Sequence, residues 1–264
     1  WLHLCILLAG LSSSARIPAE LVSQSPYVLK FRHLVDAKAC AELRRYLFAA
    51  IAFFDDLDEE GGHVRPGGEA LPEDATPRYR MQNERQLSLY FPDPPPAMQH
   101  VYEKVSQALG IYVQNIEAIY HIYAPGALPA NLHMDNFNKY LFPHRFGSVS
   151  MFFDDTEDGG TVFPLVPHAG EEPVLEWHRF LNKTRLEADG DGYTGRRVEL
   201  NEADVFRRQM LDEAIRMCHG GRASQGFAVP DMGTAYFWRN YKANGEDDVL
   251  TMHAGCGASE EHST

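Results

Sequence analysis

Residues 131–135 read Asn-Leu-His-Met-Asp, and the fold and chemistry of the chain depend on this stretch. We expect a short strand here, on which residues two positions apart point to the same face. His133 and Asp135 would then offer an imidazole and a carboxylate to one metal ion. His253, expected on another strand, would complete a set that leaves coordination positions open, as non-haem iron(II) oxygenases require. The alternative is an ordinary polar pair, because His-x-Asp is common by chance in a chain with 12 histidines.

The segments that follow this stretch decide between the two interpretations. They are 145–153 (Arg-Phe-Gly-Ser-Val-Ser-Met-Phe-Phe), 154–164 (Asp-Asp-Thr-Glu-Asp-Gly-Gly-Thr-Val-Phe-Pro), 233–240 (Gly-Thr-Ala-Tyr-Phe-Trp-Arg-Asn), 244–248 (Asn-Gly-Glu-Asp-Asp) and 251–256 (Thr-Met-His-Ala-Gly-Cys). In this order they resemble the prolyl 4-hydroxylase family of iron(II)- and 2-oxoglutarate-dependent dioxygenases. The resemblance covers residues 116–256 and is weaker over 25–54.

The resemblance implies an α+β fold with a double-stranded β-helix (jelly-roll) core, N-terminal supporting helices and a helical insertion. It also implies Fe(II) as cofactor, 2-oxoglutarate as cosubstrate, L-ascorbate as a support of turnover, and release of succinate and CO2 as peptidyl proline is hydroxylated by O2. The implied iron ligands are His133, Asp135 and His253. Tyr123 and Ser148 would contact 2-oxoglutarate, and Trp238 would lie close to the site.

One departure from the family concerns the cation that pairs with the far carboxylate of 2-oxoglutarate. The family places a lysine about ten residues beyond the distal histidine, whereas no Lys or Arg follows His253 and the last strand is missing from the pattern. A buried carboxylate without a cationic partner is destabilised, so the affinity for 2-oxoglutarate should fall. The alternative function is therefore a catalytically impaired, peptide-binding protein with the same fold. A zinc hydrolase with the same ligands is a further rival.

Three regions follow from composition and periodicity. A largely apolar run at residues 2–11 precedes small residues, so residues 1–15 read as a signal peptide or signal anchor. A buried helix is the other interpretation. Residues 16–115 form the support region and 116–264 the oxygenase core, with an insertion at 165–232. Expected helices span 36–54, 98–109 and 202–217, with Asp36 as an N-cap. Expected strands span 27–31, 87–91, 118–123, 131–135, 148–153, 161–163, 234–238 and 251–254.

Bulk properties and the insertion bear on location and partners. The formal net charge of −13 argues against nucleic-acid binding, which needs a basic face. The leader predicts a location in the endoplasmic reticulum or secretory pathway, on the lumenal side, and leaves open whether the chain has a membrane anchor.

The insertion resembles that of the transmembrane prolyl 4-hydroxylases, which implies a pairing of Cys218 with Cys256. The acidic stretch 187–199 begins like an EF-hand loop, but its twelfth position is Val198, which favours a solvated turn.

Overall fold

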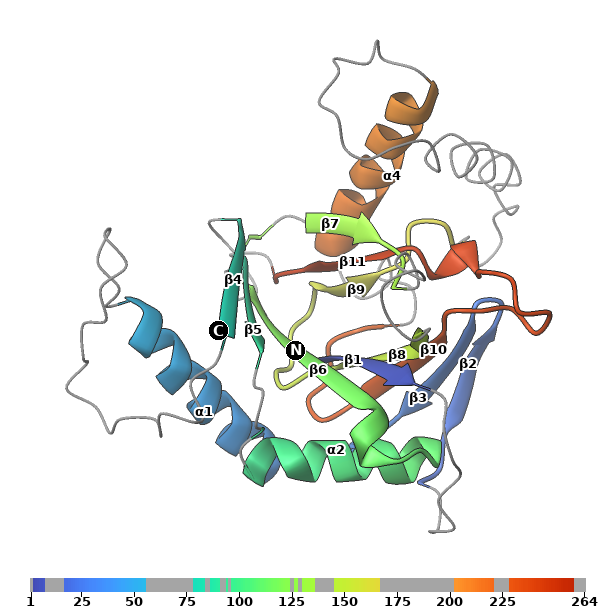
Figure 1. Cartoon of the computed structure of the whole chain (residues 1–264). Coiled ribbons are helices and arrows are strands. Elements are labelled where there is room, and N and C mark those ends of the chain that lie inside the picture. The colour runs from blue at the N-terminus through green and yellow to red at the C-terminus, as the bar shows by residue number, and fades with distance from the viewer. Residues whose placement is uncertain are drawn as a thin grey trace.

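The structure, a computed structural model, combines helices with two antiparallel sheets (Figure 1). It describes residues 2–7, 17–55, 78–83, 86–90, 94, 96–123, 126–127, 130–135, 145–166, 202–220 and 228–258. The predicted α+β class and double-stranded β-helix core stay predictions, with which the helices and antiparallel sheets of these residues are compatible. In the described part of the chain, no helix has both the length and the apolar character needed to cross a bilayer.

Eight strands form the larger sheet, in the order β2-β3-β10-β8-β1-β6-β5-β4. Their bounds are β1 Leu2–Leu7, β2 Glu20–Gln24, β3 Tyr27–Phe31, β4 Arg78–Asn83, β5 Gln86–Tyr90, β6 Ile116–Tyr123, β8 Arg145–Met151 and β10 Ala235–Arg239. The smaller sheet has the order β7-β11-β9, with β7 Ala130–His133, β9 Gly160–Val162 and β11 His253–Cys256. Two 3-10 turns, η2 Val113–Asn115 and η4 Val249–Thr251, precede β6 and β11.

Helices α1 (Ala37–Asp55) and α2 (Pro96–Leu109) run along one side of the larger sheet in Figure 1. The expected cap of α1 is confirmed, because the Asp36 carboxylate accepts a hydrogen bond of 2.8 Å from the Ala39 N–H. Proline opens α2, where its missing N–H costs nothing. The buried face of each helix packs with the sheet into the main core, which includes Leu43, Leu47, Met98, Val101, Val105, Val149, Met151 and Phe237. Each such side chain contributes about 2 kcal/mol through burial.

Alternation along β8 separates this core from a polar layer on the opposite face. Val149 and Met151 belong to the main core, whereas Ser148 and Ser150 are equally buried but point the other way. There the Ser150 hydroxyl lies 2.8 Å from the Thr161 hydroxyl of β9. The two sheets therefore face each other at this point, and buried polar side chains lie between them.

Strand β1 is the largest difference from expectation. Residues predicted as a leader form an interior strand that pairs antiparallel with both β6 and β8. Leu4 is in register with Ala118 on one side and with Val149 on the other. An apolar run of this length is compatible with a fully buried strand as well as with a leader. Removal of residues 1–15 as a signal stays a prediction, and it would open the sheet between β6 and β8.

Most expected elements appear within a few residues of their predicted bounds. The strand at 27–31 and the helices at 36–54 and 98–109 are confirmed as β3, α1 and α2, and 202–217 as α4 (Glu202–His219). Two bounds were wrong. The strand expected at 131–135 ends at His133, and the strand expected at 251–254 begins at His253, after η4. Strands β2 and β4 were not predicted. The acidic stretch 187–199 and most of the insertion lie outside the described residues.

Candidate metal centre

The smaller sheet brings the three expected metal ligands together. His133 ends β7, His253 opens β11, and these two residues are direct partners in the antiparallel ladder. Asp135 follows β7 by two residues. One nitrogen of each histidine and one oxygen of Asp135 all lie within 4.8 Å of one another. Nε2 of His133 is 3.3 Å from Oδ1 of Asp135, and Nε2 of His253 is 3.7 Å from its Oδ2.

These separations suit a single metal ion. With metal–ligand bonds of about 2.1 Å, neighbouring ligand atoms at right angles lie about 3 Å apart. The two His–Asp separations, 3.3 and 3.7 Å, are near this value, and the limit of 4.8 Å for the whole set means that the donors would move closer together around one ion. Two imidazoles and one carboxylate accept iron(II) and also zinc, so the donor set fits a metal without choosing it.

His253 is oriented by the turn that precedes it. Its Nδ1 lies 2.8 Å from the backbone carbonyl oxygen of Thr251. Because a carbonyl only accepts, Nδ1 carries the hydrogen and Nε2 of the neutral ring keeps its lone pair for a metal. Asp248 fixes the turn itself, since its side chain accepts from the Leu250 N–H at 3.2 Å. Such a partner for the second ring nitrogen is typical of metal-bound histidines.

Asp135 is held from the opposite sheet. It lies in a turn and not on the expected strand, so strand alternation does not explain its direction. Its Oδ2 instead accepts a hydrogen bond of 2.5 Å from the Ser148 hydroxyl of β8. The Asn240 amide in turn donates to the Ser148 oxygen at 3.3 Å. All three side chains are buried, and the predicted contact of Ser148 with 2-oxoglutarate stays a prediction.

Aromatic rings enclose the buried side of the centre. The ring of Trp238, on β10, lies 4.9 Å from that of His253, centroid to centroid, in an edge-on arrangement. Phe163 lies 5.7 Å from His253 and 5.2 Å from Trp238. The His133 side chain is by contrast 47% exposed. The centre is therefore closed by apolar walls on the His253 side and open to solvent on the His133 side.

The predicted cosubstrate contacts are less well defined. Tyr123 ends β6 with its ring 6.2 Å from that of His121, and burial raises the pKa of its phenol above the ordinary value. Among nearby cations in sequence, Lys242 lies 3.6 Å from Glu246 and Arg239 lies over the Tyr27 ring. These contacts give neither cation a role as a carboxylate anchor.

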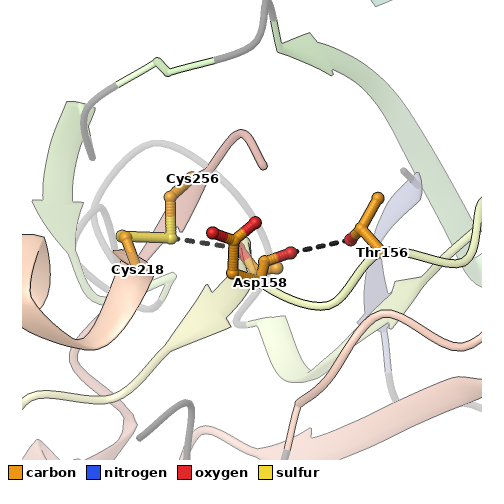
Figure 2. Close-up of a disulfide and its surroundings, with 5 residues drawn as sticks. Thr156, Asp158, Cys218 and Cys256 are labelled. Atoms are coloured by element: carbon orange, nitrogen blue, oxygen red, sulfur yellow. Dashed lines mark hydrogen bonds between the residues drawn. A yellow bond between two sulfur atoms is a disulfide. The ribbon is translucent and has the colours of Figure 1, made fainter. Parts of the chain in front are cut away.

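A disulfide between Cys218 and Cys256 confirms the pairing that the resemblance implied (Figure 2). It joins the C-terminal turn of α4 to the end of β11, three residues after His253. Beside it runs the acidic turn between β8 and β9, in which the Thr156 hydroxyl donates to the Asp158 carbonyl at 2.7 Å. The Gly159 N–H donates to the Cys218 carbonyl at 3.0 Å. The end of β11 and the start of β9 are thus tied to the insertion.

Sequence reasoning assigned no role to Phe163, Asn240 or Thr251, which contact the ligands or the residues that hold them. Phe163 and Asn240 lie in motifs that carry the resemblance, and Thr251 precedes His253 by two residues, so position relative to the motifs was the available signal.

A scan against protein-family models finds no match to the chain, and a search of the curated proteins finds no significant relative. The family resemblance therefore rests on the motifs and their order.

Proposed function

We propose that this chain is an iron(II)- and 2-oxoglutarate-dependent oxygenase that hydroxylates peptidyl proline, with L-ascorbate supporting turnover. The observation that carries the proposal is the convergence of His133, Asp135 and His253 on one point between the sheets. When bound there, iron(II) would supply the activation of O2 that oxidation of a C–H bond requires.

The chain's own residues would bind and orient the reactants. His133, Asp135 and His253 would hold the metal and leave coordination positions open for cosubstrate and O2. Trp238 and Phe163 exclude water from the His253 side. The exposed His133 side gives a peptide its approach. The acidic chain favours basic substrate segments, although net charge alone is a weak guide.

The Cys218–Cys256 disulfide supports a location in the secretory pathway, in the lumen of the endoplasmic reticulum. Disulfides persist in oxidising compartments and are rare where glutathione keeps thiols reduced. The apolar run at residues 2–11 would agree with this location only if it acts as a signal peptide or membrane anchor instead of forming β1.

The test is succinate release by the purified chain given iron(II), 2-oxoglutarate, ascorbate and a proline-rich peptide. We expect release that depends on the peptide and is lost in His133→Ala. The matched control is His100→Ala, on the exposed face of α2, which should keep full activity. Hydroxyproline in the recovered peptide identifies the target residue. A metal-loaded protein that releases no succinate with any proline-rich peptide would remove the hydroxylase proposal.

A second function is favoured by the contacts of Lys242, which pairs with Glu246, and of Arg239, which lies over the Tyr27 ring. In this alternative the chain keeps the metal centre but binds peptides without oxidising them. Titration of 2-oxoglutarate into protein loaded with Mn(II) separates the two. Micromolar binding that needs the metal supports the oxygenase, whereas peptide binding without 2-oxoglutarate binding supports the alternative.

A further inference from the structure

Asp135 is the one of the three candidate ligands that lies outside a strand. It lies beyond the end of β7, in a turn, so neither strand alternation nor a ladder hydrogen bond aims its carboxylate. His133 is by contrast set by its place in β7, and His253 by its place in β11 and its bond to Thr251. The carboxylate of Asp135 is contacted from the larger sheet, by the Ser148 hydroxyl of β8.

A directed chain of two hydrogen bonds reaches Asp135 from the opposite sheet. The Asn240 amide nitrogen donates to the Arg145 backbone carbonyl at 3.1 Å, which identifies it as the nitrogen and not the oxygen of the side chain. The same nitrogen donates to the Ser148 oxygen at 3.3 Å. Because Ser148 accepts from Asn240, its own hydrogen is available for the Asp135 carboxylate, 2.5 Å away.

The origin of this chain is rigid. The Asn240 backbone donates to the Phe146 carbonyl at 3.0 Å and accepts from the Asp248 N–H at 2.9 Å. Ser148 lies in the middle of β8, which pairs with β1 and β10 along its length. Both side chains are fully buried. A buried hydroxyl held in this way can fix the direction of the carboxylate that it contacts.

We propose that Ser148 and Asn240 are positioning residues, which hold the Asp135 carboxylate in its metal-binding orientation. The inference rests on the metal-binding part of the proposed function and not on the hydroxylation. The competing explanation is that the three groups only satisfy one another's hydrogen bonds in the protein interior. The two differ in what happens to metal affinity when the hydroxyl is removed.

Ser150 supplies a matched control for Ser148. It lies two residues further along β8, on the same face, and is equally buried. Its hydroxyl contacts Thr161 and not a metal ligand. Ser150→Ala and Ser148→Ala therefore remove the same group from the same face of the same strand. Ser148→Ala loses two hydrogen bonds and Ser150→Ala loses one, so the stability of each variant is measured beside its metal affinity.

The experiment is titration of the full chain with Co(II), followed by its visible absorption, with thermal unfolding recorded for each variant. We expect Ser148→Ala to weaken binding by about 10- to 100-fold, as the loss of a group that orients a ligand typically does. Asn240→Ala should weaken it by a smaller factor. Ser148→Thr, which keeps the hydroxyl, should restore the affinity and the spectrum, and Ser150→Ala should leave both unchanged.

Equal affinity in Ser148→Ala, Ser150→Ala and the unchanged protein would overturn the proposal and leave a purely structural role. Equal weakening in the two alanine variants would overturn it as well, because the effect would then be general loosening of β8. If Ser148→Ala does not fold, Asn240→Ala carries the same comparison against Ser150→Ala. Metal binding that depends on Ser148, with no succinate released, would overturn the hydroxylase function while supporting this inference.

Discussion

Nδ1 of His253 lies 2.8 Å from the carbonyl oxygen of Thr251, and its ring sits edge-on to Trp238 at 4.9 Å. His253 is thus both a candidate ligand and a packed part of the interior, since it is 2% exposed. His133 is an equivalent candidate ligand on the open side, with 47% of its side chain exposed. The two histidines should therefore respond differently to the same substitution.

We expect His133→Ala and His253→Ala to abolish metal binding alike, because either removes one of three donors. Only His253→Ala should lower stability substantially, by about 2 kcal/mol or more, since it leaves a cavity between buried rings. Urea unfolding of the metal-free variants measures the difference. Equal stability of the two variants would contradict the packed position of His253.

Trp238 should report on metal binding. Its ring lies against that of His253, so a paramagnetic Co(II) or Fe(II) ion at the centre should quench its fluorescence. The chain has 3 tryptophans, and the others, Trp1 and Trp177, lie outside the described residues. In Trp238→Phe the quenching should fall to whatever those two contribute. Quenching of undiminished size in Trp238→Phe would place the bound ion elsewhere.

Removal of the disulfide should lower stability more than it lowers metal affinity. The bridge joins residues 38 positions apart, and a loop of this size predicts a loss of about 4 kcal/mol in Cys218→Ser with Cys256→Ser. Metal affinity of the folded protein should persist, because β11 also pairs with β7 and β9. Thermal unfolding with and without dithiothreitol is the measurement. The double variant should be insensitive to the reductant, and a wild type equally insensitive would argue against the bridge.

Cys40 should make stability fall at alkaline pH. Burial, with a smaller effect of Asp36, raises the pKa of its thiol from 9.0 to about 11. The unfolded chain then loses the proton first, so the stabilisation is complete below pH 9 and is lost as the pH rises toward 11. Relative to Cys40→Ala, we expect the free energy of unfolding of the wild type to fall by about 2 kcal/mol by pH 11.

Urea unfolding at pH 8 and at pH 10.5 measures this effect of Cys40. Tyr102 and Tyr120, whose pKa values burial also raises, titrate in both proteins and cancel in the comparison. Parallel pH profiles for wild type and Cys40→Ala would show that Cys40 is not buried in the way described.

The place of β1 inside the sheet predicts a strong effect of proline. Leu4→Pro removes a backbone donor from a strand paired on both sides, where proline is hardly tolerated. Val22→Pro is the control, because Val22 lies at an irregularity of the edge strand β2 and is 37% exposed. We expect Leu4→Pro to lower the melting temperature by several degrees more. Equal melting of the two variants would favour an independent leader.

Local signals predicted the helices and most strands well. Apolar spacing and the Asp36 cap gave α1, and both signals are contained within a few consecutive residues. Strand β1 was missed because an apolar run of six residues has no periodicity that separates a buried strand from a leader. Its partners, β6 and β8, are remote in sequence, and only tertiary pairing identifies it as a strand.

The ligands were predicted from the order of motifs, whereas the contacts that orient them were not. His133, Asp135 and His253 converge as expected. The bond from Ser148 to Asp135 joins two sheets, and no spacing rule within one strand reveals it. The strand expected at 131–135 was wrong at its C-terminal end. Strand β7 ends at His133, the residue that pairs with His253.

The order of synthesis has a consequence for β1, which lies between β6 and β8 in the larger sheet. Of the described strands it leaves the ribosome first, yet its partners β6 and β8 follow only at 116–123 and 145–151. An apolar, extended segment must therefore wait until residues 116–151 have been made before its place in the sheet exists. During that interval it is exposed to pairing with other strand edges, as long-range sheets are slow to form and prone to misassembly. Co-translational protection of residues 2–7 thus becomes a condition for efficient production of the folded chain.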